Sequence, residues 1–261
     1  MDDLTFILPV RIESIIRLEN FLAVLQFLRS TKSKIIVIEA DNYTKDLLRP
    51  FLPKSHSIKY IYAPDDDPVF FRTHFINMAL QEVDTDIVSV WDADVVVDKK
   101  QLLASCEAIR SGQCDFSFPY NGTFLNTDMT FRQEYLQHHD IRVLLKFRNY
   151  LNILYGNKFV GGGFLIDAEK YKSSGGENEN FYGWGPEDGE RVQRWESLGY
   201  RIHRSEGPMF HLCHPRDING GPRTKLYQDL CFLQINNSLY KSSNEVIQYK
   251  DKYEQDRQPS F

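Results

Sequence analysis

The 261-residue sequence contains no CxxC pair, no run of lysines and arginines, and no apolar stretch long enough to span a bilayer. Its four cysteines (Cys106, Cys114, Cys213 and Cys231) lack metal-binding spacing and are expected to be reduced thiols. The net charge of −5 argues against surfaces that bind nucleic acid or anionic membranes, because both need concentrated positive charge. A phosphorylated ligand would therefore depend on a metal ion or a few arginines.

The N-terminal segment Met1-Asp2-Asp3-Leu4 carries two acids and leads straight into a strand-like segment, without the basic and apolar regions of a secretory signal. We therefore expect a cytoplasmic protein without an integral membrane segment, with peripheral membrane contact as the alternative. The composition is that of a folded chain, since 42% of the residues are hydrophobic and 18 Phe and 14 Tyr supply a large core.

Strands and helices alternate in the first half of the chain. Short β-branched and apolar runs predict strands at 5–10, 34–40, 58–63, 86–93 and 115–119. Apolar residues at helical spacing predict helices at 14–30, 71–83 and 99–110. This alternation indicates βαβ units, and hence an α/β fold with a mainly parallel, Rossmann-like sheet flanked by helices.

The second half is less regular. Residues 130–155 have a long helical pattern without an internal Pro or Gly, and residues 158–216 are rich in glycine, aromatic residues and acids. Further helices are expected at 187–198, 224–239 and 245–254. We expect a single domain over 1–261, divided into a nucleotide-binding half (1–120), a loop-rich half (121–217), and closing helices with a tail (218–261).

Asp92-Ala93-Asp94 follows the fourth expected strand. In open parallel sheets, ligands bind at the carboxyl ends of the strands. Carboxylates two residues apart in an extended segment point to the same side and can address one Mg²⁺ or Mn²⁺ ion bridging to a pyrophosphate. Such triplets also occur often by chance in solvated turns. The position of this one after a buried strand is therefore what favours a metal site.

Trp184 lies between Gly183 and Gly185, an arrangement typical of a mobile lid over a sugar ring. Glu187 and Asp188 follow, and one of them can take the proton from an attacking hydroxyl. The alternative is a surface turn that begins a helix, whose N-terminus two acids would stabilise. Both interpretations can hold together.

His211 and His214 can supply imidazoles to the same cation. Their spacing would place them on opposite faces of a straight strand, so both can bind only across a turn, which Pro215 permits. The pair His138-His139 lies in the long helical segment without a partner acid pattern, and we expect it to be structural.

The ordered motifs resemble the β-1,4-galactosyltransferase family of metal-dependent inverting GT-A glycosyltransferases. The segments concerned are Pro9-Val10-Arg11, Phe70-Phe71-Arg72 with Asn77, Asp92-Ala93-Asp94, Phe159-Val160-Gly161-Gly162, Gly183-Trp184-Gly185-Pro186-Glu187-Asp188 and His211-Leu212-Cys213-His214. They cover roughly residues 5–97 and 158–216. Pro186 and Gly189 depart from the family pattern, which has a glycine and a further acid there, and residues 130–155 have no counterpart.

The resemblance implies a GT-A fold and a role for each segment. Pro9, Val10, Arg11, Arg72 and Asp92 would bind the nucleotide, and Phe159, Gly161, Gly162, Trp184 and Gly185 would contact the donor sugar or the acceptor. The metal ligands would be Asp94 with His211 and/or His214, for Mn²⁺ or alternatively Mg²⁺. Asp188 would be the catalytic base, and Glu187 would bind the acceptor.

The expected enzyme transfers a hexose or N-acetylhexosamine, with galactose or N-acetylgalactosamine favoured, from a UDP-sugar to a hydroxyl of a saccharide or glycoconjugate, with inversion. A bacterial-type member that builds a surface polysaccharide is expected, because the anchor and stem of the secretory-pathway enzymes are missing. One alternative is a metal-dependent nucleotidyltransferase, which would need a glycine-rich basic loop where this chain has Pro9-Val10-Arg11-Ile12-Glu13. The other is a catalytically silent sugar-nucleotide-binding module.

Overall fold

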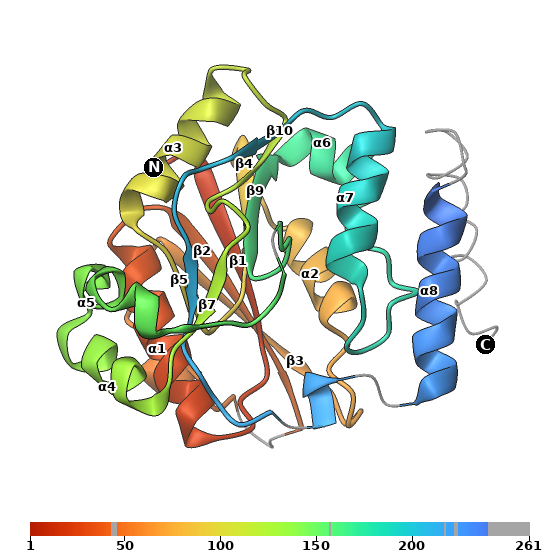
Figure 1. Cartoon of the computed structure of the whole chain (residues 1–261). Coiled ribbons are helices and arrows are strands. Elements are labelled where there is room, and N and C mark those ends of the chain that lie inside the picture. Colours follow the sequence, from red (N-terminus) through yellow and green to blue (C-terminus); the bar gives the residue numbers. More distant parts are fainter. Residues whose placement is uncertain (43–45, 157, 217, 222–223, 240–261) are drawn as a thin grey trace.

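The computed structural model describes residues 1–42, 46–156, 158–216, 218–221 and 224–239. A seven-stranded sheet of order β10-β6-β9-β4-β1-β2-β3 lies at its centre (Figure 1). The strands are β1 (Leu4–Val10), β2 (Lys34–Asp41), β3 (Ile58–Pro64), β4 (Ile87–Trp91), β6 (Phe116–Phe118), β9 (Gly163–Asp167) and β10 (Ile202–Arg204). Neighbouring strands pair in parallel except around β9, which is antiparallel to both β4 and β6. The expected α/β fold with a mainly parallel sheet is confirmed.

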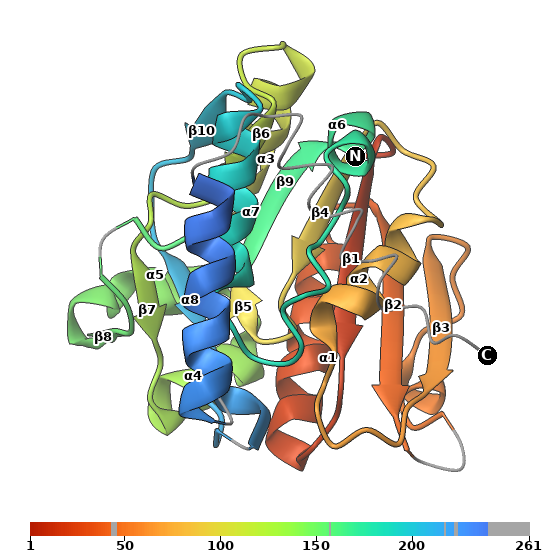
Figure 2. The same ribbon diagram turned by 90° about the vertical axis from the view of Figure 1, so that its right-hand side faces the viewer.

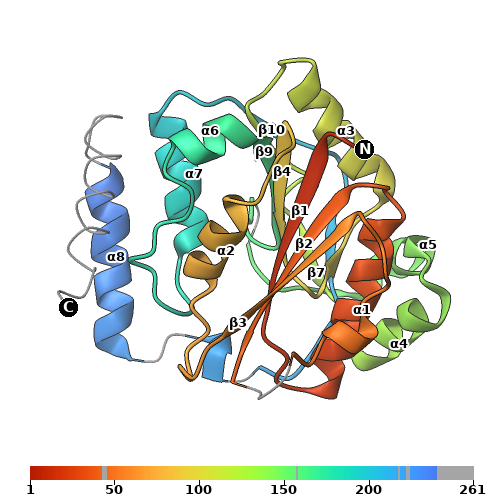
Figure 3. The ribbon, with the colours of Figure 1, turned by 180° about the vertical axis from the view of Figure 1, so that it is seen from behind.

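Helices cover both faces of this sheet. They are α1 (Ile15–Arg29), α2 (Arg72–Leu80), α3 (Lys99–Arg110), α6 (Ala168–Ser173), α7 (Glu187–Ser197) and α8 (Lys225–Leu239). Figures 1 and 3 show α1 and α3 on one side of the sheet and α2, α6 and α7 on the other. Helix α8 packs alongside α7, as Figure 2 shows from the side.

Local capping explains why two helices begin where the sequence predicts. The Ser14 side chain accepts a hydrogen bond from the Arg17 backbone N–H and so begins α1. Asp98 and Gln101 form a capping box at the start of α3. Because such caps join residues three apart, they are readable from the sequence alone.

A second, four-stranded sheet was not predicted. Its order is β5-β11-β7-β8, and its strands are β5 (Val95–Val96), β11 (Met209–His211), β7 (Phe124–Asn126) and β8 (Asn152–Ile153). Strands of two or three residues are too short to show a period in the sequence. This sheet nevertheless places His211 opposite Val95, immediately after the Asp92–Asp94 turn.

The continuous helical pattern expected over residues 130–155 is wrong. The segment forms α4 (Met129–His138), α5 (Ile141–Lys146), a 3-10 turn η2 (Arg148–Tyr150) and strand β8. His139 adopts a left-handed conformation with φ of 49°, which ends α4, and its N–H donates to the Tyr135 carbonyl. Asp140 then caps α5 by accepting from the Arg142 N–H. His139 is therefore structural, as expected, but as a helix terminator.

The remaining expectations concern the C-terminal helices, the cysteines and membrane-spanning segments. The helix expected at 224–239 is α8, whereas the helix expected at 245–254 and the polar tail lie outside the described residues. All four cysteines are free thiols. None of the helices formed by the described residues is both long and apolar enough to cross a membrane.

Candidate active site

A cavity of about 490 Å³ lies at the carboxyl ends of β1 and β4. Fourteen of the fifteen predicted site residues line it: Pro9, Val10, Arg11, Arg72, Asp92, Asp94, Phe159, Gly162, Trp184, Gly185, Glu187, Asp188, His211 and His214. Gly161 is the exception and lies behind the wall, where a Cβ atom would come within 2.7 Å of the Asp188 Oδ2. The motifs that are scattered along the chain therefore converge on one space.

The Asp92–Asp94 turn is held between two other motifs. The Asp92 N–H donates to the Gly162 carbonyl at 2.9 Å, and the Leu212 N–H donates to the Asp94 carbonyl at 2.7 Å. The Trp91 Nε1 spans the turn by donating to the Val95 carbonyl at 3.0 Å. Backbone contacts thus join the strand-end acids to the glycine segment and to the histidine segment.

Asp94, His211 and His214 form a group whose ligand atoms all lie within 4.8 Å of one another. The His214 Nε2 is 3.0 Å from one Asp94 carboxylate oxygen, and the His211 Nε2 is 3.8 Å from the other. Strand β11 ends at His211, so the chain turns before Pro215 and both imidazoles reach the same side. The turn that the sequence requires for joint metal binding is present.

The second nitrogen of each imidazole has an acceptor of its own. The His211 Nδ1 is 2.7 Å from the Asn126 Oδ1, and the His214 Nδ1 is 2.8 Å from the Pro215 carbonyl. Such partners select the tautomer that leaves Nε2 for a metal. Burial would raise the pKa of Asp94, but His211 and His214 outweigh it and hold the pKa well below its usual range.

One carboxylate with two imidazoles fits a cation such as Mn²⁺ better than Mg²⁺, which prefers an all-oxygen shell. Asp92 is not part of this group among the described residues. Its Oδ1 instead accepts from the Arg72 Nη2 at 2.6 Å. The two aspartates of the triplet therefore have different partners, and their separate roles stay a prediction.

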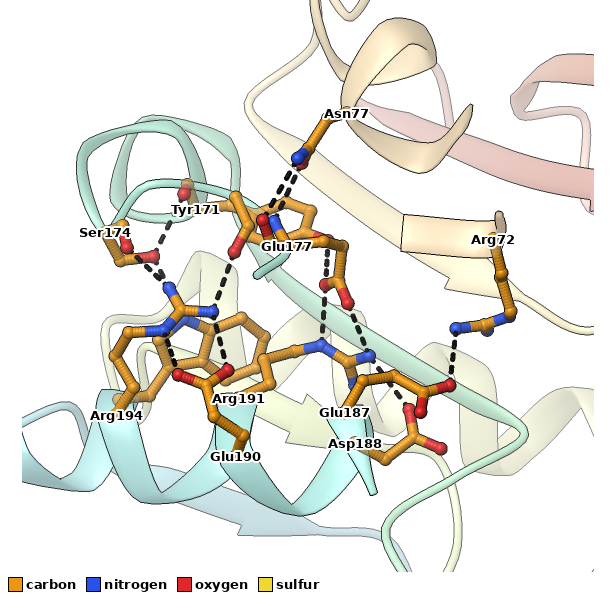
Figure 4. A network of polar contacts seen from close by, with 12 residues as sticks. Arg72, Asn77, Tyr171, Ser174, Glu177, Glu187, Asp188, Glu190, Arg191 and Arg194 are labelled. Carbon is orange, nitrogen blue, oxygen red and sulfur yellow. Dashed lines mark hydrogen bonds and ion pairs between the residues drawn. The ribbon is translucent and has the colours of Figure 1, made fainter. Parts of the chain in front are cut away.

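Arg72 also approaches Glu187, with 3.8 Å between Nη1 and Oε1 (Figure 4). Burial, together with the neighbouring Asp188 carboxylate, raises the pKa of Glu187 to about 8. Within the described part of the chain, neither the Arg72 Nη1 nor the Glu187 Oε2 has a hydrogen-bond partner, although both are buried. Unsatisfied buried groups on a cavity wall are what a polar ligand would satisfy.

Asp188 lies beside Glu187 in the first turn of α7. Its Oδ1 accepts from the Arg191 Nη2 at 2.8 Å. Since α7 begins at Glu187, the helix-start interpretation of these acids holds together with their position on the cavity. Trp184 also lines the cavity, and its side chain is 43% exposed.

Arg11 lines the cavity, but its guanidinium is already engaged. It donates to the Ala40 and Asp67 carbonyls and forms a 2.6 Å ion pair with Asp65. The expected contact with the nucleotide stays a prediction. These contacts indicate that Arg11 also organises the ends of β2 and β3.

Several residues that line or support the cavity escaped the sequence analysis, and four of them make informative contacts. Arg17 lies 3.3 Å from both ring nitrogens of His214, and Asn126 orients His211. Arg216 donates to the Tyr155 hydroxyl, and the Tyr155 ring stacks on Phe159 with 4.3 Å between centroids. Arg17 lies in an ordinary helical pattern and Asn126 in a three-residue strand, so neither carried a local signal.

Comparisons with known proteins agree with the motifs. A protein-family model described as the N-terminal domain of galactosyltransferase matches residues 142–215. Human β-1,4-galactosyltransferase 7 is 24% identical over 164 residues, which are 61% of this chain and 41% of the relative. The chain thus spans about two fifths of that relative's length.

Two solved structures of Drosophila β-1,4-galactosyltransferase 7 are also similar. The catalytic domain in complex with xylobiose has a TM-score of 0.49 and 18% identity, over 78% of this chain and 65% of that chain. A mutant in complex with manganese, UDP-Gal and xylobiose has the same TM-score and coverage, with 16% identity. The ordered motifs, the family model and the human protein agree in one respect: each shows a similarity of this chain to galactosyltransferases.

Proposed function

We propose that this chain is a Mn²⁺-dependent glycosyltransferase that moves a hexose or N-acetylhexosamine from a UDP-sugar to a saccharide or glycoconjugate hydroxyl, with inversion. One observation carries the proposal: the Asp94-His211-His214 group and the acids at the start of α7 line the same cavity. A cation site alone would suit many nucleotide-binding proteins. The resemblance and the human relative favour galactose or N-acetylgalactosamine as the donor sugar, and a role in polysaccharide or glycoconjugate synthesis.

On the donor side, Asp94, His211 and His214 would hold the cation. A bound Mn²⁺ supplies positive charge that stabilises the diphosphate as it leaves. Arg72 would donate a hydrogen bond to the same diphosphate, since its Nη1 is buried at the cavity without a hydrogen-bond partner among the described residues. Trp184, between two glycines, would cover the bound sugar and exclude water.

On the acceptor side, Asp188 would take the proton from the attacking hydroxyl. Glu187 has a pKa of about 8, so it would be mostly protonated at neutral pH and would donate a hydrogen bond to the acceptor. A carboxylic acid that stays neutral in this way can act as a hydrogen-bond donor.

The test is to measure UDP release from a panel of UDP-sugars, with and without Mn²⁺ and simple sugar acceptors. Sugar-dependent release that needs Mn²⁺ supports the transferase. Metal-dependent UDP binding without turnover would indicate the silent module, and release of pyrophosphate from a nucleoside triphosphate would indicate the nucleotidyltransferase.

A further inference from the structure

A buried ion pair lies directly behind the acids of the cavity (Figure 4). The Arg191 Nε and Nη2 donate to the two Glu177 carboxylate oxygens at 2.7 and 2.9 Å, and both side chains are 1% exposed. Burying two charges is costly unless the geometry is good and other hydrogen bonds assist. This pair has the two parallel bonds of the strongest arginine–carboxylate geometry.

Arg191 connects this pair to the cavity. Its Nη2 donates both to Glu177 and, at 2.8 Å, to the Oδ1 of Asp188, the proposed base. The guanidinium also packs over the Phe164 ring, 4.4 Å from its centroid. Contacts on several sides therefore leave Arg191 little freedom to swing away from Asp188.

Glu177 is itself held in place from two other elements. The Asn77 side chain on α2 donates to the Glu177 carbonyl at 3.0 Å and accepts from its N–H at 2.8 Å. The Tyr171 hydroxyl on α6 donates to the Glu177 carboxylate. Arg191 outweighs the effect of burial on this carboxylate and lowers the pKa of Glu177 to about 2, so the pair is ionised across the physiological range.

The other oxygen of Asp188 is confined as well. A Cβ atom on Gly161 would come within 2.7 Å of the Asp188 Oδ2, so the backbone at Gly161 approaches this oxygen closely. With Arg191 on Oδ1 and Gly161 beside Oδ2, the carboxylate has a defined orientation on the cavity wall.

We propose that Arg191, braced by Glu177, is a positioning residue that fixes the Asp188 carboxylate for proton transfer. This inference rests on the proposed function, in which Asp188 is the base. The step itself is balanced: the acceptor hydroxyl loses its proton to Asp188, its oxygen forms the new glycosidic bond, and the nucleoside diphosphate leaves with the bonding electron pair.

The same helix offers a matched control. One turn further along α7, Arg194 pairs with Glu190, and these side chains are 0% and 2% exposed. The hydrogen bonds of Arg194 go to Glu190 and to the carbonyls of Ser174 and Gly176, none of which lines the cavity. Neutralising this second pair removes a comparable amount of buried charge but leaves the hydrogen bond between Arg191 and Asp188 in place.

The kinetic test compares two double variants that neutralise each pair, Glu177→Gln with Arg191→Gln and Glu190→Gln with Arg194→Gln. The assay uses UDP-galactose, Mn²⁺ and the acceptor sugar that supports wild-type turnover. We expect kcat to fall about 100-fold in the first variant at an unchanged donor KM, because a displacement near 1 Å can have that effect. The second variant should keep kcat within about 2-fold, and Arg191→Lys should recover part of the loss. Equal kcat values in the two double variants would overturn the proposal.

A structural readout separates this proposal from the proposed function. Crystal structures of the wild type and of both double variants show the Asp188 carboxylate directly, whether or not the protein turns over sugar. We expect Asp188 to leave its wild-type orientation in the Glu177→Gln, Arg191→Gln variant only. An unchanged Asp188 there would exclude the positioning role. Absence of turnover in the wild type would instead overturn the proposed function. If the double variant fails to fold, Arg191→Lys is compared with Arg194→Lys by the same two measurements, with the same outcomes deciding.

Discussion

Asp94 is partly buried and Glu187 is buried on the same cavity, yet the surroundings of these two carboxylates act in opposite directions. Two imidazoles face Asp94 and hold its pKa well below the usual range despite burial. Glu187 lies next to another carboxylate, and burial raises its pKa to about 8, with only partial compensation from Arg72. The partners, rather than the degree of burial, decide which acid is ionised.

Under the proposed function, this difference divides the cavity into a cation side and an acceptor side. The Asp94 side is an anion with imidazoles beside it, the arrangement that a cation needs. The Glu187 side retains a proton at neutral pH next to Asp188, the arrangement that acceptor binding and proton transfer need. Each of the following predictions changes a residue on, or next to, one of these two sides.

The largest expected effect is on turnover after loss of the proposed base. Asp188→Asn should reduce kcat by about 10²–10⁴-fold, the usual contribution of general base catalysis, while UDP binding stays near normal. UDP-release kinetics and UDP titration calorimetry measure the two quantities. Asp128→Asn is the control, because Asp128 caps α4 away from the cavity lining and Asn caps helices equally well. Near-normal turnover in Asp188→Asn would show that the base is another residue.

The opposite side is tested by Mn²⁺ affinity. His214→Ala should weaken Mn²⁺ binding at least about 100-fold, since even loss of an outer-shell partner typically costs 10–100-fold. Asp92→Asn should have a much smaller effect, because Asp92 pairs with Arg72 outside the cation group. Titration followed by electron paramagnetic resonance measures free Mn²⁺ in both cases. If Asp92→Asn proves the more damaging, the ligand set is assigned wrongly.

The raised pKa of Glu187 makes stability depend on pH. The folded protein keeps the Glu187 proton up to about pH 8, whereas the ordinary value is 4.5. Between these values the folded state binds the extra proton, so the contribution of Glu187 to stability falls as pH rises through this window and is constant on either side. Each pKa unit corresponds to about 1.4 kcal/mol. Urea unfolding at a series of pH values should therefore show a steeper decline in the wild type than in Glu187→Gln, and parallel curves would contradict the assignment.

The smallest effect is expected from the glycines beside Asp188. Gly161→Ala places a Cβ atom 2.6 Å from the Phe159 ring and 2.7 Å from the Asp188 carboxylate. Overpacking of this kind typically costs about 1–3 kcal/mol. Gly189→Ala, inside α7 with no described atom beyond the adjacent helix backbone within 4 Å of the new Cβ, should instead stabilise the fold by up to about 1 kcal/mol. Urea denaturation distinguishes the two, and equal stabilities would mean that the Gly161 backbone can shift.

The regular part of the fold was readable from the sequence because its signals are local. Strands β1, β2 and β4 are apolar runs, and α3 carries both a helical period and its own capping box. The break at His139 was not readable, since no Pro or Gly marks it and the left-handed residue is a histidine. The second sheet escaped for a different reason, since strands of two or three residues are too short to show an alternation in the sequence.

The sequence by itself determined the α/β alternation and the order of the acid, glycine, tryptophan and histidine motifs, since each depends on a few neighbouring residues. Only the tertiary structure decided that Asp94 joins His211 and His214 while Asp92 pairs with Arg72. It alone showed that Arg191 links Glu177 to Asp188. Contacts between β5 and β11, and between α7 and the chain before it, set these partners, and sequence spacing does not encode such contacts.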